Sequence, residues 1–421
     1  MAKILSILAK IVIARKISTY AMSIYSLTLP TLSLLLNIAQ LGIPTTISKL
    51  IAKKKFSTFK IMQTSFLILL LVDLIIGIIY IFLVPSLATN YLKNDLTKLT
   101  LYGMVFLIPI ISFTSLLKGY FIGIDKVSIT NKCQISEELT RLLFIIIFVE
   151  FIDKNNVSFL SFFAMFSSII GEIASLIHLL ICLKNKNKNI VRRIKINNEH
   201  NKIISKTIFK LSIMSTSTRM IGSLIYFLEP IIYTYLMMKI NVSNEKLTLD
   251  YGIVNSYVFP LLTLPSFFSN CVSIFLLPKL SKLIENKDFK NSLKIFSFST
   301  LFSLVTGLIC VLVIYIFPNF FTNILYGKII GIEYIKKYAF FIIVLFIQPI
   351  IHVTLISFDK EKLLLTESII CNTLKIICFF VFIPIYQIDG MIISILISLY
   401  VSIIIHIYTL IKEFLLLKNK R

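Results

Sequence analysis

The sequence lacks the short motifs that mark most nucleotide-driven and hydrolytic proteins. It has no GxxxxGK[ST] phosphate loop, no GxGxxG motif after a strand, no HExxH zinc motif and no GxSxG nucleophile turn. No residues are therefore available for ATP-driven transport or for hydrolysis. We expect a protein that is not an enzyme and that needs no cofactor or metal.

Cysteine is scarce and shows no CxxC pair or histidine at metal-ligand spacing. Most of the six cysteines lie inside apolar runs, which predicts small core side chains and neither disulfides nor a metal site. The four histidines are scattered, and packing or interfacial roles are expected for them. These residues are Cys133, Cys182, Cys271, Cys310, Cys371 and Cys378, with His178, His200, His352 and His406.

Charged residues make up only 15% of the chain, whereas 57% is hydrophobic and the mean hydropathy is +0.91. So many apolar runs exceed what a soluble core of 421 residues can bury, and they place the chain in a bilayer. The net charge of +23 comes from Lys and Arg in short segments between the runs, where they set orientation, so no nucleic-acid partner is expected. No cleavable signal peptide is evident, and a first spanning helix would serve for insertion.

About twelve hydrophobic segments are separated by charged or Pro/Asn-rich breaks, which predicts an all-α polytopic membrane protein. One alternate set of connections holds most of the basic residues, so both termini are expected on the cytoplasmic side. The segments are 3–14, 19–47, 61–85, 98–117, 135–152, 158–183, 206–238, 249–278, 293–317, 336–357, 363–385 and 390–411.

Two stretches of the first half recur in the second half at nearly the same offset. Ser48-Lys49-Leu50-Ile51 matches Ser281-Lys282-Leu283-Ile284, and Asp125-Lys126 matches Asp359-Lys360. Six predicted crossings separate each matched pair, so the two copies have the same orientation. This pattern indicates a parallel repeat of two six-helix lobes, an arrangement found in transporters.

The repeat predicts three parts: an N-terminal lobe over residues 1–184, a basic cytoplasmic linker over 185–205 and a C-terminal lobe over 206–421. The first predicted helix, 3–14, is too short to cross a hydrocarbon core of about 30 Å. Its counterpart, 206–238, is much longer. We therefore expect that the native chain starts further upstream, the alternative being a half-span helped by bilayer thinning and by Lys3 reaching the interface.

Charges inside predicted spans are the candidate functional residues, because an unpaired ion in hydrocarbon costs several kcal/mol. Arg219 and Glu229 are nearly three helical turns apart and can face one cavity. Arg219 would meet an anionic substrate group or pair with a carboxylate of a neighbouring helix. Asp73 and Glu229 are candidate ion or proton sites, although a carboxylate bonded to nearby hydroxyls would explain Asp73 equally well.

A second group of charges opens the predicted segment 135–152. Glu137 and Glu138 precede Arg141 by four and three residues, so a local surface ion pair explains them. The repeat counterpart of Arg141, however, is Lys375, which has no acid one turn before it. A basic residue at equivalent depth in both halves suggests a positively lined cavity, to which Arg141 and Lys375 would contribute.

Prolines interrupt both segments that carry the Ser-Lys-Leu-Ile repeat. Each one removes a backbone hydrogen bond and can kink or break its helix. They are candidate hinges for rocking of the lobes, although static kinks that aid packing are as common. The residues are Pro30, Pro44, Pro260, Pro265 and Pro278.

Several runs together resemble the stage V sporulation protein B branch of the multidrug/oligosaccharidyl-lipid/polysaccharide flippase superfamily, to which the lipid II flippases and the MATE exporters are related. The resemblance implies two six-helix lobes around a central cavity and alternating access for lipid-linked saccharides. It also implies that Arg15, after Ala14, faces the cavity as an arginine does in lipid II flippases. The runs are 219–230, 251–253, 276–281, 41–44 with 47–49, 118–123 and 324–327.

These observations together predict a flippase of a bacterial plasma membrane that moves a polyprenyl-pyrophosphate-linked saccharide, such as a peptidoglycan or polysaccharide precursor. Its pyrophosphate would bind Arg15, Arg219, Arg141 and Lys375, because guanidinium groups hold such oxygens in a bidentate fork. We expect a monomer that contacts membrane lipids and cell-wall synthesis proteins. The alternatives are a cation-coupled multidrug exporter of the same superfamily and a membrane scaffold for envelope synthesis.

Overall fold

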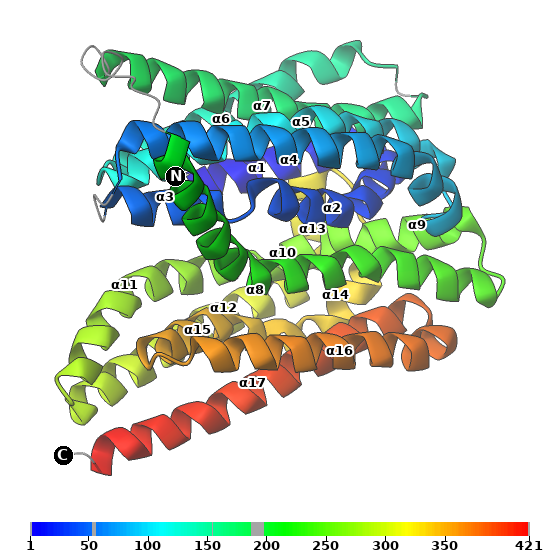
Figure 1. Ribbon diagram of the computed structural model, residues 1–421. Helices are drawn as coiled ribbons and strands as arrows, with labels where there is room; N and C mark the ends of the chain where they lie inside the picture. Colours follow the sequence, from blue (N-terminus) through cyan, green and yellow to red (C-terminus); the bar gives the residue numbers. More distant parts are fainter. Residues whose placement is uncertain (1, 53–55, 154, 187–197, 420–421) are drawn as a thin grey trace. The chain divides into compact units, whose positions relative to one another are not determined.

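The computed structural model describes residues 2–52, 56–153, 155–186 and 198–419, and every regular element in these ranges is a helix (Figure 1). Ten helical stretches are long and apolar enough to cross a membrane. The all-α polytopic fold is thus confirmed, since a helix satisfies its own backbone hydrogen bonds in hydrocarbon. Two predicted segments fall short of that standard: α1 has only 15 residues, and α6 carries too many charged side chains.

The chain divides into two compact units. The first unit comprises Met1–Tyr235 and Asn244–Gly252, and the second comprises Leu236–Ser243 and Ile253–Arg421. α8 belongs mainly to the first unit, where Ser212 donates a hydrogen bond to Thr46 of α3 at 3.2 Å. Residues 187–197 of the predicted linker lie outside the described residues. The lobe boundaries predicted from the repeat stay a prediction.

In the first unit, long helices alternate with short ones. The core lies where α3 and α4 pack on α5, around the buried side chains of Ile47, Ile61 and Phe121. The helices are α1 (Ala2–Lys16), α2 (Thr19–Gln40), α3 (Ile43–Ala52), α4 (Thr58–Ser86), η1 (Leu87–Tyr91), η2 (Asp95–Thr97), α5 (Lys98–Gly123), α6 (Val127–Phe148), η3 (Val149–Phe151), α7 (Val157–Lys186), α8 (Asn198–Lys239) and α9 (Asn244–Gly252).

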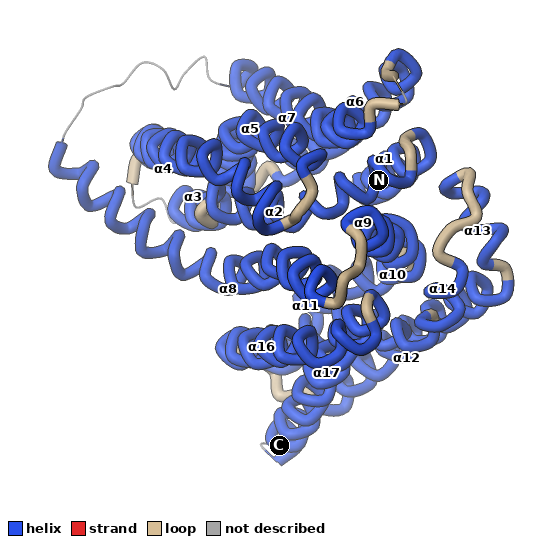
Figure 2. The backbone as a smooth tube through the Cα atoms, turned by 90° about the vertical axis from the view of Figure 1, so that its right-hand side faces the viewer, coloured by secondary structure: helices blue, strands red, loops and turns tan. Residues whose placement is uncertain are grey.

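In the second unit, α16 and α17 form a long helical pair (Figure 2). There, α11 packs on α15. Its buried side chains include Ile351 and Leu355 of α15 and Leu410 of α17. The helices are η5 (Ile253–Val258), α10 (Phe259–Thr263), α11 (Ser266–Glu285), α12 (Phe289–Ile316), α13 (Pro318–Tyr326), α14 (Ile332–Tyr338), η6 (Phe340–Phe346), α15 (Gln348–Ser357), α16 (Glu361–Tyr386) and α17 (Ile388–Asn419).

The matched Asp-Lys pairs adopt the same turn in the two units. Asp125 and Asp359 have φ of 59° and 57°. In each copy the Lys amide donates to the carbonyl oxygen five residues earlier, Phe121 for Lys126 and Leu355 for Lys360. This is the hydrogen-bond pattern that ends helices when one residue becomes left-handed, a conformation that Asp tolerates better than most residues. Sequence identity at these positions therefore corresponds to identical local geometry.

Gly119 allows α5 to approach α3 closely. A Cβ at this position would lie 2.8 Å from the carbonyl oxygen of Pro44 and 2.9 Å from its Cα. Both are backbone atoms, so relief requires a helix shift. We expect Gly119→Ala to lower the free energy of unfolding by about 1–3 kcal/mol, the usual cost of overpacking, in a denaturation series in detergent. Gly77→Ala is the matched control, because no atom lies within 4 Å of its added Cβ. Equal stability of the two variants would contradict the close approach.

Candidate functional site

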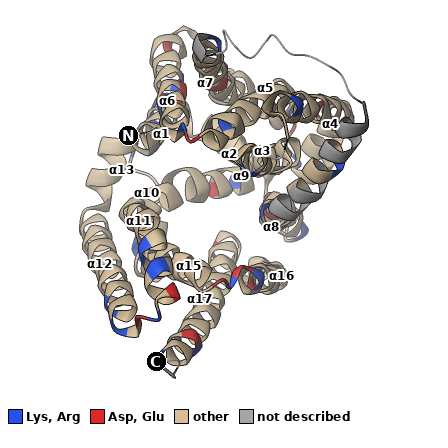
Figure 3. Cartoon of the chain, turned by 60° about the vertical axis from the view of Figure 1, so that its left-hand side comes forward, with Lys and Arg blue, Asp and Glu red and all other residues tan. Residues whose placement is uncertain are grey.

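The two arginines at the centre of the sequence prediction are exposed on helices of the first unit. Arg15 lies in the last turn of α1, and Arg219 lies on α8. Arg219 forms no ion pair with any side chain that the structure describes. Between residues 211 and 238, the charged residues of the sequence are Arg219 and Glu229. Charged segments are sparse along the helices of the chain (Figure 3). The place of Arg219 in a substrate cavity stays a prediction.

Arg141 lies at a partly buried contact between α6 and α1. Its guanidinium is 4.0 Å from the carboxylate of Glu138, and both side chains are mostly buried. Lys10 of α1 interacts electrostatically with both, and Ser6 of α1 hydrogen-bonds to Glu138. Two cationic groups thus share one carboxylate here, which makes this contact locally basic.

Glu137, beside this contact, turns away from Arg141 and toward α5. Its carboxylate lies 3.4 Å from Nζ of Lys118. The side chain of Glu137 is 21% exposed and that of Lys118 is 19% exposed. The local surface ion pair predicted for Glu137, Glu138 and Arg141 is therefore wrong for Glu137, and the remaining pair is not on the surface. The reason is packing: Gly171 of α7 lets the backbone of α7 approach Glu137 and Arg141 closely, which covers this face of α6.

Glu172 extends the polar contact from α6 to α7. Its side chain accepts a hydrogen bond from Thr114 of α5 at 3.0 Å and interacts with both Lys118 and Glu137. We call Thr114, Lys118, Glu137 and Glu172 the buried polar network of the first unit. It joins three helices by hydrogen bonds and charge, in mostly buried surroundings.

Asp73 is a buried carboxylate between α4 and α5. It is 8% exposed, and Ser112 of α5 donates a hydrogen bond to its Oδ1 at 2.8 Å. Its Oδ2 has no hydrogen-bond partner among the described residues. Only one of the two carboxylate oxygens of Asp73 therefore accepts a hydrogen bond from a described residue. Its role as an ion or proton site stays a prediction.

Glu229 is buried in a cluster of tyrosines, whereas Arg219 of the same helix is exposed. Tyr226 and Tyr251 both interact electrostatically with Glu229. The rings of Tyr233 and Tyr251 lie 5.6 Å apart and join α8 to α9. Glu229 and Arg219 therefore have different surroundings within the first unit.

The prolines fall into two structural classes. Pro30 and Pro278 lie inside the continuous helices α2 and α11. Pro44, Pro260 and Pro265 instead lie at helix starts, where the missing N–H costs little. The backbone is left-handed at Leu41 and Gly42 before Pro44, and α10 ends at Thr263 before Pro265, whereas α10 with Pro260 follows η5 directly. Hinge motion at any of the five stays a prediction.

Lys375 lies on α16 in the second unit, with its ammonium 6.0 Å from the ring centroid of Phe379. One and two turns before it on the same helix are Cys371 and Glu367. Glu367 is buried, and its carboxylate lies 3.0 Å from Nε2 of His406 on α17. His352 of α15 interacts electrostatically with both Glu367 and His406.

We did not predict this group from the sequence, although the packing role expected for His406 agrees with its buried contact with Glu367. The spacing of polar residues along α16 and α17 could have indicated this group. Glu367, Cys371 and Lys375 repeat every four residues on α16, and Ser398, Ser402 and His406 do so on α17. Such spacing places three polar side chains on one face of a helix. Two polar faces in consecutive helices suggest that the helices pair through them.

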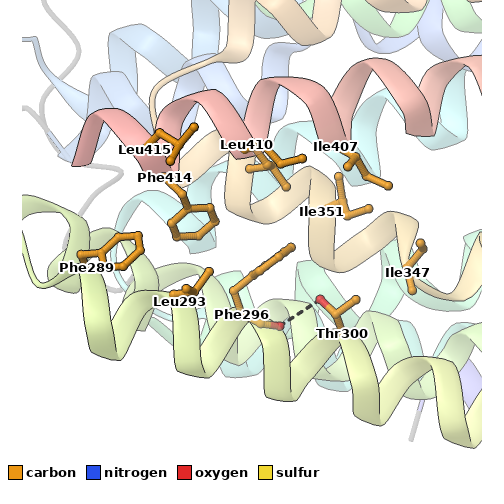
Figure 4. A pocket seen from close by; sticks show the side chains of 11 residues that line it. Phe289, Leu293, Phe296, Thr300, Ile347, Ile351, Ile407, Leu410, Phe414 and Leu415 are labelled. Carbon is orange, nitrogen blue, oxygen red and sulfur yellow. Dashed lines mark hydrogen bonds between the residues drawn. The ribbon is translucent and has the colours of Figure 1, made fainter. Parts of the chain in front are cut away.

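An apolar pocket of about 410 Å³ lies inside the second unit, between α12, α15 and α17 (Figure 4). Phe296 of α12 and Phe414 of α17 project into it from facing helices, and Ile351 of α15 also lines it. The hydroxyl of Thr300 donates to the carbonyl oxygen of Phe296 at 2.9 Å, so it offers no free donor to a ligand. The lining therefore suits a hydrocarbon chain and not a polar molecule.

Among solved structures, two neighbours have the same TM-score of 0.71 at 13% sequence identity. One is the inward-facing conformation of a multidrug resistance MATE family transporter of the MOP superfamily, where the match covers 100% of this chain and 96% of that one. The other is lipid II flippase MurJ in an inward closed conformation, where the match covers 99% of this chain and 88% of that one. At this identity they show a common fold, which confirms the fold expected from the resemblance.

Two curated proteins of Bacillus subtilis (strain 168) are similar in sequence. Stage V sporulation protein B is 27% identical over 379 residues, which cover 89% of this chain and 73% of that protein. Sporulation protein YkvU is 21% identical over 355 residues, which cover 83% of this chain and 78% of that protein. A family model described as polysaccharide biosynthesis protein matches residues 1–284. Since this match covers more than half of the sequence, the chain belongs to the polysaccharide biosynthesis protein family.

Proposed function

We propose that the protein is a flippase that moves a polyprenyl-pyrophosphate-linked saccharide across a bacterial plasma membrane by alternating access. The observation that carries the proposal is membership of the polysaccharide biosynthesis family in a chain with ten candidate membrane spans. The fold shared with a lipid II flippase supports it. Family and fold point to a transporter and not to a catalytic enzyme.

In this proposal the pyrophosphate is held by cationic side chains. Arg15 and Arg219 are exposed and can reach a substrate, and each guanidinium can bind phosphate oxygens in a bidentate fork. Arg141 and Lys375 are the second pair. Arg141 shares its carboxylate with Lys10, so positive charge remains at the contact between α1 and α6. The apolar pocket of the second unit has the chemistry to hold part of the polyprenyl chain.

We further propose that both termini are cytoplasmic, because basic residues concentrate in the connections on that side. The protein would act as a monomer in contact with membrane lipids and cell-wall synthesis proteins. A second candidate, a cation-coupled multidrug exporter, is favoured by one observation: the buried Asp73 has an oxygen with no hydrogen-bond partner among the described residues. A cation or proton could occupy that position.

A lipid-scrambling assay tests the proposal. The full chain is reconstituted in liposomes with a fluorescent polyprenyl-pyrophosphate saccharide, and a membrane-impermeant reductant bleaches the outer leaflet. We expect the protein to make the inner-leaflet fraction accessible, while protein-free liposomes retain it. A saccharide linked to the same polyprenyl chain without the pyrophosphate is the control and should stay protected. Export of a cationic dye with no movement of the lipid would favour the exporter instead.

A further inference from the structure

A carboxylic acid and an imidazole lie buried against each other in the second unit. Glu367 of α16 is 7% exposed and His406 of α17 is 2% exposed. Oε2 of Glu367 is 3.0 Å from Nε2 of His406. The other ring nitrogen, Nδ1, is buried and has no hydrogen-bond partner in the part of the chain that the structure describes. Both helices are long and apolar enough to span a membrane.

Polar contacts between the same two helices surround this pair. Ser402 and Cys371 both hydrogen-bond to the side chain of Glu367. Ser398 donates to the carbonyl oxygen of Cys371 at 2.7 Å. We call these five residues, Glu367, Cys371, Ser398, Ser402 and His406, the polar seam. It gives the carboxylate of Glu367 three side-chain donors, which is the requirement for burying such a group.

Few other charges face the seam. From α15, His352 interacts electrostatically with both Glu367 and His406, and its side chain is exposed. η6 carries no charged residue. The two charged residues of α12, Lys290 and Lys294, are exposed in its first two turns.

The remaining charged groups on the two helices lie near their ends or have partners of their own. Glu413 of α17 pairs with Lys360 at 2.8 Å. Lys375 of α16 lies over the ring of Phe379, and Asp389 of α17 pairs with Lys337. Glu361 and Lys362 are exposed in the first turn of α16, and Lys412 and Lys418 are exposed in the last turns of α17. The ionisable groups of the pair and its surroundings are therefore Glu367, His406 and His352.

The buried pair favours one bound proton. With one proton, it is either an ion pair or two neutral groups, and its net charge is zero in both forms. Without that proton, an uncompensated carboxylate would remain among apolar helices, which costs several kcal/mol. A second proton on Nδ1 would make the pair net positive, and imidazole is the side chain that takes up a proton near neutral pH.

We propose that Glu367 and His406 form a proton-binding site in the second unit, which is loaded and unloaded through His352. A proton from water binds the ring of His352 and passes to Nδ1 of His406, and the Nε2 proton moves to Oε2 of Glu367. Only N–H and O–H bonds form and break. The site goes beyond the proposed flippase activity and does not depend on which molecule is transported.

Proton occupancy also sets the strength of the seam. Donors such as Ser402 and Cys371 bind an ionised carboxylate about twice as strongly as a neutral acid. Loading Glu367 therefore loosens α16 from α17, and unloading it tightens them.

Acid–base difference infrared spectroscopy of the full chain in lipid nanodiscs tests the site. We expect a carboxylic-acid C=O band that grows as the pH falls and is absent in Glu367→Gln. In His406→Gln the midpoint of this band should move by about one pH unit or more, because its charge partner is gone. Glu361→Gln, in the exposed first turn of the same helix, is the control and should leave the spectrum unchanged.

A pH-jump measurement tests the route. In His352→Gln the same band should reach the same final intensity, but at least about tenfold more slowly. The proton site is overturned if Glu367→Gln gives the wild-type difference spectrum, or if His406→Gln leaves the midpoint unchanged. An unchanged rate in His352→Gln overturns the route. These spectra do not depend on lipid flipping, so a negative scrambling assay leaves their interpretation intact.

Discussion

Arg219→Ala is expected to abolish complementation of a flippase-deficient strain while leaving the protein inserted in the membrane. Two charge-assisted hydrogen bonds to a pyrophosphate contribute about 3 kcal/mol or more together. Their loss should slow transport at least about a hundredfold. The exposed position of Arg219 on α8, with no ion pair to any described side chain, means that its removal leaves no buried charge behind.

The appropriate comparison is with Met220→Ala, an exposed neighbour without charge on the same turn. It should complement normally. Arg219→Lys should give intermediate growth, because an ammonium keeps the charge but loses the bidentate geometry. Membrane levels are followed by immunoblot. Normal growth with Arg219→Ala at wild-type abundance would remove Arg219 from the proposed binding site.

Lys118→Met should cause a large loss of stability in the first unit. It removes the cation that lies between Glu137 and Glu172 and leaves two carboxylates side by side in the buried polar network. Removing one partner of a buried ion pair costs about 3–5 kcal/mol, because the remaining charge is uncompensated. The free energy of unfolding in detergent, measured with a denaturant series, should fall by this amount.

Lys16→Met is the matched control for this experiment. Lys16 pairs with Glu150 at 2.6 Å, but the two side chains are 41% and 51% exposed. Exposed pairs contribute about 1 kcal/mol at most, because water replaces the lost partner. If both methionine variants lose the same small amount, Lys118 does not hold the network together.

Hydropathy was sufficient to predict the fold class, because a segment that crosses hydrocarbon must satisfy its own backbone hydrogen bonds, and a helix does so. It was less successful where a span is not one regular helix. The predicted segment 249–278 is divided among α9, η5, α10 and α11. Pro260 and Pro265 signalled this break, but proline alone cannot distinguish a kink, as at Pro278, from a new helix start.

The candidate site was harder to predict, because its charges depend on packing between distant helices. Spacing on α6 suggested that Glu137 pairs with Arg141, yet Glu137 faces Lys118 of α5, a contact that no local pattern encodes. Glu367 and His406 are far apart in the sequence. Only the comparison of polar faces on α16 and α17 would have suggested their contact. Burial of Asp73 against Ser112 agrees with one of the two alternatives considered for that residue.

The identical turns at Asp125 and Asp359 limit how far apart the helices that they join can lie. Only residues 124–126 connect α5 to α6, and only residues 358–360 connect α15 to α16. A connection this short keeps the two joined helix ends on one face of the bilayer. Three residues extend over about 10 Å at most, so neither connection can reach across a hydrocarbon core of about 30 Å. The duplicated turn therefore keeps the end of one helix beside the start of the next in both halves of the chain.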